Sequence, residues 1–517
     1  MKKILWADDE IDYLKPHLLF LKEKGYEVTP VVSGVDVIDL LKETPLQWDV
    51  VMLDENMPGL SGIETLAEVR RINADVPVVM ITKSEEEDLM DKAVGNRIDD
   101  FLIKPVNPRQ ILLTLKKILE APRLVTEQSA SSYRREFLDI DNEIRNASSF
   151  AHWAALYRRL VSRTLDLEEN APDIAGLLQS QYKEAETGFM RFVKNNYASW
   201  IGHDNCAAPL MSHEVLEKII EPALLAGERP VLLLLDNFRL DQWLTVRPVF
   251  SEHFTTVNEN LYCSLLPTAT QYARNALLSG MLPFEIEARF PELWVDEDAP
   301  ESKNLNEEPL IKAFLERNAL NHKTVRYYKA NDSENLNTVI KNFGNDKSDF
   351  TVIVVNFIDI LSHSKADSRM MRELASTDAA YRSLTLSWFR HSPILELLDK
   401  IRASQRTLFV TTDHGSILVE TPLKVIADKN TNTALRYKVG KNLGYDPKRV
   451  MAATKPAEIG LPSPNISSTY IFAGEGDFFL YPNNYNHYAN MFKDTYQHGG
   501  VSMEEMIVPV VKLQPRL

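Results

Sequence analysis

The stretch WDVVMLDENMPGLSG, residues 48–62, decides the fold of the N-terminal part of the chain. It begins as a short apolar run with the composition of a buried strand, and Asp54 ends that run. Similar runs recur through the first 120 or so residues, and amphipathic helical patterns separate them. This alternation predicts an α/β fold with a doubly wound parallel sheet. The other runs are KKILWADD (2–9), EVTPVV (27–32), PVVMIT (77–82) and DDFLIKP (99–105).

Polar side chains gather where these strands end. Asp8 and Asp9 follow the first strand, Asp54 the third and Lys104 the fifth, while Thr82 ends the fourth. Because the carboxyl ends of parallel strands meet at one edge of a sheet, we expect these side chains to lie close together. Three carboxylates suit Mg²⁺, and a lysine with a hydroxyl suits a phosphoryl group on Asp54. A pair of acids alone is more often a solvated loop, but the combination predicts a phosphorylation switch.

These residues resemble the receiver domain of bacterial response regulators, over residues 1 to about 120. The motif D-x-x-M-P-x-x-x-G begins at Asp54, and a proline follows Lys104 as it usually does in that family. The resemblance implies that Asp54 accepts a phosphoryl group from a sensor histidine kinase. Lys83 departs from the family, which usually has a small residue there. The resemblance also implies direct Mg²⁺ ligation by Asp9 and Asp54, with Asp8 through water and the Asn56 backbone carbonyl, and a switch built from Thr82, Phe101 and Lys104.

The middle of the chain has a helical pattern with almost no strand signal. Apolar residues recur there at steps of three and four, which is one face of a helix, and residues 170–172 interrupt the pattern. We predict a bundle of about three helices that serves as a spacer and a dimerisation element. The expected domains are a receiver at 1–122, a helical bundle linker at 123–205 and a larger α/β domain at 206–517. The face consists of Phe150, Trp153, Tyr157, Leu160, Thr164 and Leu167.

In the C-terminal part, three buried strands each run into an aspartate that is accompanied by histidines. PVLLLL leads to Asp236, TVIVVNFI to Asp359 and TLFVTT to Asp413, and MIVPVVKL (506–513) is expected as a further parallel strand. The stretch 285–347 is polar enough for an insertion or cap. One aspartate after a strand is more often a turn or cap residue, but three Asp and three His are the ligands of two zinc-type sites. The histidines are His363, His414 and His498.

A hydroxyl nucleophile is available in LPTATQYARNALLSG, residues 266–280. Thr268 and Gln271 have the spacing of a capping box, so both threonines could simply start a helix. The two readings are compatible, because a helix N-terminus is also where a phosphoryl group is held. Thr270 in the first turn is then the candidate nucleophile.

These C-terminal residues resemble the alkaline phosphatase superfamily, in particular its PglZ-type branch. P-T-x-T is followed ten residues after Thr270 by Gly280, as in phosphodiesterase members. The family's usual asparagine three residues after the nucleophile is Ala273 here, and Arg274 and Asn275 are the candidate substitutes that bind substrate. The resemblance implies one zinc ion held by Asp236, Thr270, Asp413 and His414, and a second held by Asp359, His363 and His498.

Composition limits the remaining functions. Lys and Arg number 58 against 73 Asp and Glu, a net charge of −15, which argues against a chain that mainly grips nucleic-acid phosphates. Only Cys206 and Cys263 are present, so we expect a reducing cytoplasm rather than a disulfide framework. No run of apolar residues is long enough to span a membrane.

The order of the three parts resembles the family of PorX-type response regulators of type IX secretion systems. We therefore expect phosphorylation of Asp54 to control dimerisation and a dizinc phosphodiesterase that acts on a phosphodiester such as an oligonucleotide. The alternative is a regulatory scaffold that binds a sigma factor or a secretion-system component, with the zinc site structural. Retention of Thr270 favours the enzyme, since a structural site needs no nucleophile.

Overall fold

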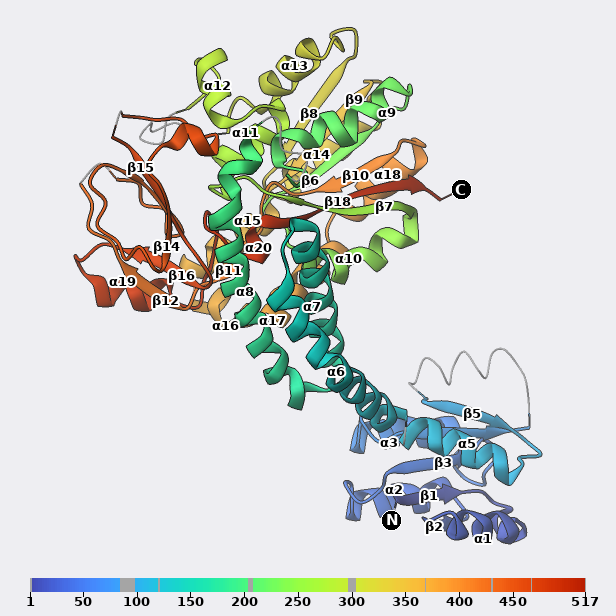
Figure 1. Cartoon of the computed structure of the whole chain (residues 1–517). Coiled ribbons are helices and arrows are strands. Elements are labelled where there is room, and N and C mark those ends of the chain that lie inside the picture. Colours follow the sequence, from blue (N-terminus) through green and yellow to red (C-terminus); the bar gives the residue numbers. More distant parts are fainter. Residues whose placement is uncertain are drawn as a thin grey trace. The chain divides into compact units, whose positions relative to one another are not determined.

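The computed structural model describes residues 2–83, 98–119, 121–202, 208–295, 304–367, 369–428, 431–465 and 467–516. It divides into two compact units, Met1–Ser132 and Tyr133–Leu517 (Figure 1). Among the described residues, no helix combines the length and apolar character needed to cross a membrane.

The first unit is a doubly wound α/β domain, as the sequence predicts. Its parallel five-stranded sheet has the order β2-β1-β3-β4-β5. Side chains alternate between two cores, so helices α2 and α3 cover one face of the sheet while α1 and α5 cover the other. The strands are β1 (Lys2–Ala7), β2 (Tyr26–Val31), β3 (Val50–Asp54), β4 (Val78–Thr82) and β5 (Asp100–Ile103); the helices are α1 (Lys15–Glu23), α2 (Gly34–Glu43), α3 (Gly62–Ile72) and α5 (Pro108–Leu119).

The helical linker is also confirmed. It consists of α6 (Ala121–Asn146), α7 (Phe150–Asn170) and α8 (Pro172–Ile201), and the division between the two units falls within α6. The predicted face of α7 is buried, except that Thr164 is only half-buried. Trp153 of α7 packs edge-on against Phe189 of α8, with ring centroids 5.7 Å apart. The domain boundaries drawn from the sequence stay a prediction.

The main sheet of the second unit has six strands in the order β7-β18-β10-β6-β9-β8. β8, β9, β6 and β10 are parallel, so their carboxyl ends share one edge. The expectation of a further parallel strand near the C-terminus is wrong, because β18 runs antiparallel to both β10 and β7. The strands are β6 (Val231–Leu235), β7 (Phe254–Cys263), β8 (Val325–Ala330), β9 (Phe350–Val355), β10 (Leu408–Thr411) and β18 (Ile507–Pro515).

The polar stretch 285–347 is not simply an insertion, because it contributes β8 to the edge of the main sheet. Extra structure comes instead from 417–497, which forms three small sheets whose strands of two to five residues are too short for a sequence signal. Their pairings are β11 (Ile417–Leu418) with β17 (Tyr496–Gln497), β12 (Thr421–Lys424) with β16 (Asp477–Leu480), and β13 (Tyr437–Gly440) and β14 (Val450–Ala453) with β15 (Thr469–Ala473).

The helices of the second unit surround its main sheet (Figure 1). Short 3₁₀ or π turns occur at Ser212–Glu214, Leu216–Ile220 and Pro456–Ile459, and one at Ile11–Leu14 in the first unit. The α-helices that follow the linker are α9 (Glu221–Leu225), α10 (Leu240–His253), α11 (Thr270–Ser279), α12 (Pro283–Arg289), α13 (Glu307–Arg317), α14 (Ser333–Phe343), α15 (Phe357–Asp367), α16 (Arg369–Leu374), α17 (Asp378–His391), α18 (Ile394–Ala403), α19 (Tyr485–Phe492) and α20 (Met503–Met506).

Candidate functional site

The first unit brings its predicted acidic residues and lysine together at one edge of the sheet. Asp8, Asp9 and Asp54 each present a carboxylate oxygen, and these oxygens lie within 4.8 Å of one another. Lys104 Nζ lies 2.9 Å from Asp8 Oδ2 and 3.0 Å from Asp54 Oδ2. The strand ends therefore form a carboxylate cluster that is closed on one side by an ammonium group.

This cluster has the electrostatics of a site for a cation. Burial raises the pKa of Asp54, and the charges of Asp8 and Asp9 raise it further against the lowering effect of Lys104. Asp54 Oδ1 is buried and accepts no hydrogen bond from the described residues. A hard divalent cation would reduce the repulsion among the three carboxylates and would provide a ligand bond for Asp54 Oδ1.

The remaining receiver residues flank the cluster. Thr82 is buried at the end of β4, whose Ile81 pairs with Asp54 of β3. Phe101 lies on β5 with 40% of its surface exposed. Asn56 is exposed in the segment between β3 and α3. Lys83 is exposed too, and its Nζ lies 3.9 Å from Glu10 Oε2.

The second unit forms two ligand clusters at the carboxyl edge of its main sheet. The first consists of Asp236 after β6 with Asp413 and His414 after β10, and all three residues are buried. Their ligand atoms lie within 4.8 Å of one another. Because β6 and β10 are adjacent and parallel, they deliver these side chains to the same point.

The second cluster joins Asp359, His363 and His498, again with ligand atoms within 4.8 Å of one another. The sequence placed Asp359 at the end of a strand, but β9 ends at Val355 and Asp359 lies in the first turn of α15. His363 follows one turn later on the same helix, with its Nε2 3.4 Å from Asp359 Oδ1. The i,i+4 spacing therefore aims both side chains in one direction.

The two clusters touch through their histidines. The rings of His414 and His498 stack with centroids 4.4 Å apart. Nδ1 of His414 lies 3.1 Å from the Gly415 carbonyl, and Nδ1 of His498 lies 3.2 Å from the Thr268 carbonyl. A backbone acceptor at Nδ1 fixes the tautomer that leaves the Nε2 lone pair free for a metal ion.

Burial and neighbouring charges shift the pKa values of these ligands in different directions. Burial lowers the pKa of His498 to about 3, and the nearby His414 lowers it as well, so this imidazole is neutral at physiological pH. Burial raises the pKa of Asp236 well above its usual range despite Arg274. For Asp359, burial acts to raise the pKa, but the hydrogen bond and charge of His363 lower it well below the usual range. Strong perturbation of this kind is typical of functional sites.

Thr270 lies beside the first cluster, at the first position of α11. Its Oγ1 is 3.3 Å from His414 Nε2. The predicted capping box is wrong, because Ala269 is the N-cap and makes no side-chain cap bond. Thr268 instead donates from Oγ1 to the Gly500 carbonyl at 3.0 Å and accepts from the Gly499 amide at 3.0 Å, which ties this loop to the loop that carries His498.

Arg274 is fully buried beneath the first cluster, one turn after Thr270. It forms an ion pair with Asp236, and its Nε donates to Asp413 Oδ2 at 2.9 Å. Its Nη1 also lies 3.2 Å from Glu307 of α13, a buried acid that sequence reasoning missed because it is distant in the chain. Asn275 is buried on the same helix.

The donor chemistry of both clusters fits divalent metal ions. Buried Asp236 Oδ1 accepts no hydrogen bond among the described residues, although its partner oxygen pairs with Arg274. Asn237, which the sequence did not single out, donates from Nδ2 to Asp359 Oδ1 at 3.2 Å and supports the second cluster. Zinc accepts carboxylate oxygens, a hydroxyl oxygen and imidazole nitrogens whose ring orientation is fixed by a hydrogen bond.

Comparison with protein families identifies all three parts of the chain. Residues 215–513 match the BREX system PglZ alkaline phosphatase-like domain, which covers more than half of the 517 residues. Residues 123–201 match the PorX response regulator linker domain, and residues 4–116 match the response regulator receiver domain. The chain therefore belongs to the PglZ alkaline phosphatase-like family, joined to a receiver and linker in the architecture of a PorX-type response regulator.

Several individual relatives each match less than a third of the chain. The Haemophilus influenzae transcriptional regulatory protein CpxR homolog is 36% identical over 121 residues, 23% of this chain and 51% of the relative. Escherichia coli BaeR is 29% identical over 168 residues, 29% of this chain and 68% of BaeR. The chain thus spans about half the length of the first of these relatives. Among solved structures, Vibrio cholerae CheY4 is similar with 28% identity, a TM-score of 0.22, and coverage of 23% of this chain and 99% of CheY4.

Proposed function

We propose that the output domain of this response regulator hydrolyses phosphodiesters with Thr270 as the nucleophile. The observation that carries the proposal is the position of Thr270 Oγ1, which lies 3.3 Å from His414 Nε2 at the start of a helix and beside a metal-type ligand cluster. The residues that would hold two zinc ions are Asp236, Thr270, Asp413 and His414 for one, and Asp359, His363 and His498 for the other.

The chain's own residues then divide the work. When bound, divalent ions would act as Lewis acids that stabilise negative charge on the attacking and leaving oxygens. Thr270 Oγ1 would lose its proton to solvent and form the new bond to phosphorus, while the bond from phosphorus to the ester oxygen breaks and that oxygen takes up a proton. Water would later hydrolyse the ester between Thr270 and phosphorus and restore the hydroxyl. The first-turn amides of α11 face the same region and favour negative charge there. Arg274 holds Asp236 and Asp413 in place.

Charge favours a diester over a monoester as the substrate. A monoester carries about one more negative charge, which usually requires an added cation such as an arginine clamp. Arg274, the cation nearest to Thr270 in sequence, is engaged by three carboxylates rather than free to bind a phosphate. A phosphodiester such as an oligonucleotide therefore suits the site better.

The experiment that tests this function is hydrolysis of a bis-aryl phosphate by the purified chain, with and without a chelator. We expect activity that is lost on chelation and restored by added zinc. Hydrolysis that is indifferent to chelation would contradict the metal ligation.

For the receiver, we propose that a sensor histidine kinase phosphorylates Asp54 in the presence of Mg²⁺ held by Asp8, Asp9, Asp54 and the Asn56 carbonyl. The phosphoryl group would attract Thr82 and Lys104 and rearrange the surface around Phe101, which favours a homodimer. The linker match supports assigning this switch to the cytoplasmic regulation of type IX secretion.

A small phosphodonor with Mg²⁺ is expected to shift the chain from monomer toward dimer, because phosphorylation of Asp54 adds negative charge beside the carboxylates of Asp8 and Asp9 and so rearranges the surface around Phe101. Light scattering measures the mass with and without the donor. Asp54→Ala should abolish the shift, whereas Asp36→Ala on the same unit should leave it unchanged. An unchanged mass while Asp54 is demonstrably phosphorylated would contradict the proposal.

A further inference from the structure

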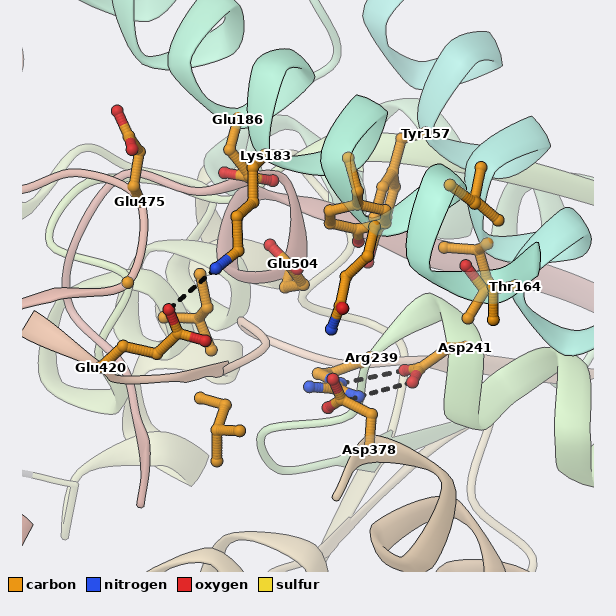
Figure 2. Close-up of a pocket in the computed structure, with 18 of the residues that line it drawn as sticks. Tyr157, Thr164, Lys183, Glu186, Arg239, Asp241, Asp378, Glu420, Glu475 and Glu504 are labelled. Atoms are coloured by element: carbon orange, nitrogen blue, oxygen red, sulfur yellow. Dashed lines mark hydrogen bonds and ion pairs between the residues drawn. The ribbon is translucent and has the colours of Figure 1, made fainter. Parts of the chain in front are cut away.

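A cavity of about 460 Å³ lies in the second unit, and neither metal-type cluster contributes to its lining. Residues of α7 and α8 from the linker form one side, and residues of the output domain form the other (Figure 2). The cavity therefore lies where the linker helices meet the output domain. Its volume is in the range of sites that bind small molecules.

The cavity has an excess of acidic side chains. Its lining contains eight Asp or Glu side chains and four Lys or Arg side chains. Arg239 pairs with Asp241 and lies 2.7 Å from Asp378, so its charge is already used. Lys183 forms an ion pair with Glu420 (Figure 2), and its Nζ lies 3.0 Å from Glu420 Oε2. The other two cations are also paired, Arg382 with Asp241 and Glu168, and Arg449 with Asp477.

Two of the carboxyl groups at the cavity, those of Glu186 and Glu504, form no ion pair among the described residues, although the charge of Arg239 acts on Glu504. Glu186 lies on α8 and Glu504 on α20, and both side chains line the cavity. Burial and the charge of Glu504 raise the pKa of Glu186 well above its usual range. The Met503 amide, the first of α20, donates to both carboxylate oxygens of Glu186, at 3.1 Å and 3.2 Å. Glu186 therefore cannot turn away from Glu504 without breaking these hydrogen bonds. A ligand with positive charge would relieve this repulsion.

A buried tyrosine provides an independent indication of a ligand. Tyr157 is only 1% exposed, and it extends from α7 into the cavity (Figure 2). No hydrogen bond to its hydroxyl occurs among the residues that the structure describes, and burial, followed by the charge of Glu504, raises the pKa of this hydroxyl well above its usual value. Its ring lies edge-on to that of Tyr182, with centroids 6.3 Å apart. A hydroxyl that lines a cavity and has no protein partner can be satisfied by an occupant with a polar head.

We propose that this cavity binds a small organic cation that carries an amine or guanidinium group. The carboxyl pair of Glu186 and Glu504 would receive the positive head, and the Tyr157 hydroxyl would accept a hydrogen bond from it. The aromatic wall of Tyr157 and Tyr182 favours an organic cation over a metal ion, because tyrosine rings attract ammonium and guanidinium groups. The cavity volume of about 460 Å³ is also larger than a single metal ion requires.

The occupant would contact the linker and the output domain at once. Glu186 belongs to α8, whereas Met503 and Glu504 begin α20, shortly after the loop that carries His498. Binding at this junction does not depend on the proposed hydrolase activity, so a direct binding measurement separates the two proposals.

The test is isothermal titration calorimetry of the full chain with putrescine, with arginine and with magnesium chloride in a low-salt buffer. We expect saturable binding of putrescine or arginine near one site per chain. Glu504→Gln, which removes the charge but keeps the shape, should weaken binding about tenfold or more, and Tyr157→Phe several-fold. Glu396→Gln, on the exposed surface of α18 and outside the cavity, is the matched control and should bind as the wild type does.

Thermal melting of each variant verifies that it is folded. Absence of saturable binding for both organic cations in the wild type would overturn the proposal. Binding of magnesium alone, or equal weakening by Glu504→Gln and Glu396→Gln, would overturn it as well, because these results indicate a metal site or non-specific surface attraction.

Discussion

Thr270→Ala is expected to lower kcat/KM for a bis-aryl phosphate by about ten-thousandfold. The substitution removes only the hydroxyl and its methyl neighbour from the first position of α11, and Thr270 is not part of the apolar core. The ligand clusters, the helix and Arg274 all stay, so the loss would report on bond formation rather than on folding. The measurement is steady-state hydrolysis by zinc-loaded protein.

The matched control for this prediction is Thr270→Ser, which keeps the hydroxyl. It should retain activity within about tenfold of the wild type, because a serine oxygen reaches the same position with more rotational freedom. Activity that survives unchanged in Thr270→Ala would remove Thr270 as the nucleophile, whatever the metal content.

Arg274→Met is expected to destabilise the second unit by about 3–5 kcal/mol, which is typical when one partner of a buried ion pair is removed. Arg274 is fully buried and contacts Asp236, Asp413 and Glu307. Methionine fills much of the same volume but leaves Asp236 and Asp413 without the Arg274 cation. Glu307 keeps Lys329, whose Nζ lies 3.0 Å from it. Thermal unfolding in the presence of a chelator measures the effect, since bound metal ions would mask part of it.

Arg289→Met in the same unit is the control for Arg274→Met. Arg289 lies on α12 with its side chain largely exposed, 3.8 Å from Glu285, and such surface pairs contribute less than about 1 kcal/mol. Equal melting temperatures for both variants would show that the Arg274 network contributes little.

The sequence predicted those parts of the sites that lie directly at strand ends. Asp54, Asp236 and Asp413 each follow a recognisable buried strand, and parallel neighbours must deliver such residues to one edge. Their functional roles stay predictions. The two α/β folds and the helical linker followed from the same periodicity and are confirmed.

Other features depend on contacts that no local pattern encodes. The direction of β18 is set by its pairing with β7 and β10, and an apolar run reads the same in either direction. The apolar run continues past Val355 into α15, so the sequence pattern predicts a strand that runs up to Asp359. Glu307 reaches Arg274 across 33 positions of sequence, and Glu186 meets Met503 across 317. Such pairs are fixed by tertiary packing alone.

The ratio of kcat/KM for a bis-aryl phosphate to that for the matching mono-aryl phosphate tests the central claim most directly. It is measured on the wild-type, zinc-loaded chain. We expect both esters to be hydrolysed and the diester to have the larger kcat/KM, because Arg274 is held by Asp236, Asp413 and Glu307 and adds no clamp for the extra charge of a monoester. A larger kcat/KM for the monoester, or no hydrolysis of either ester by protein that has bound zinc, would contradict it.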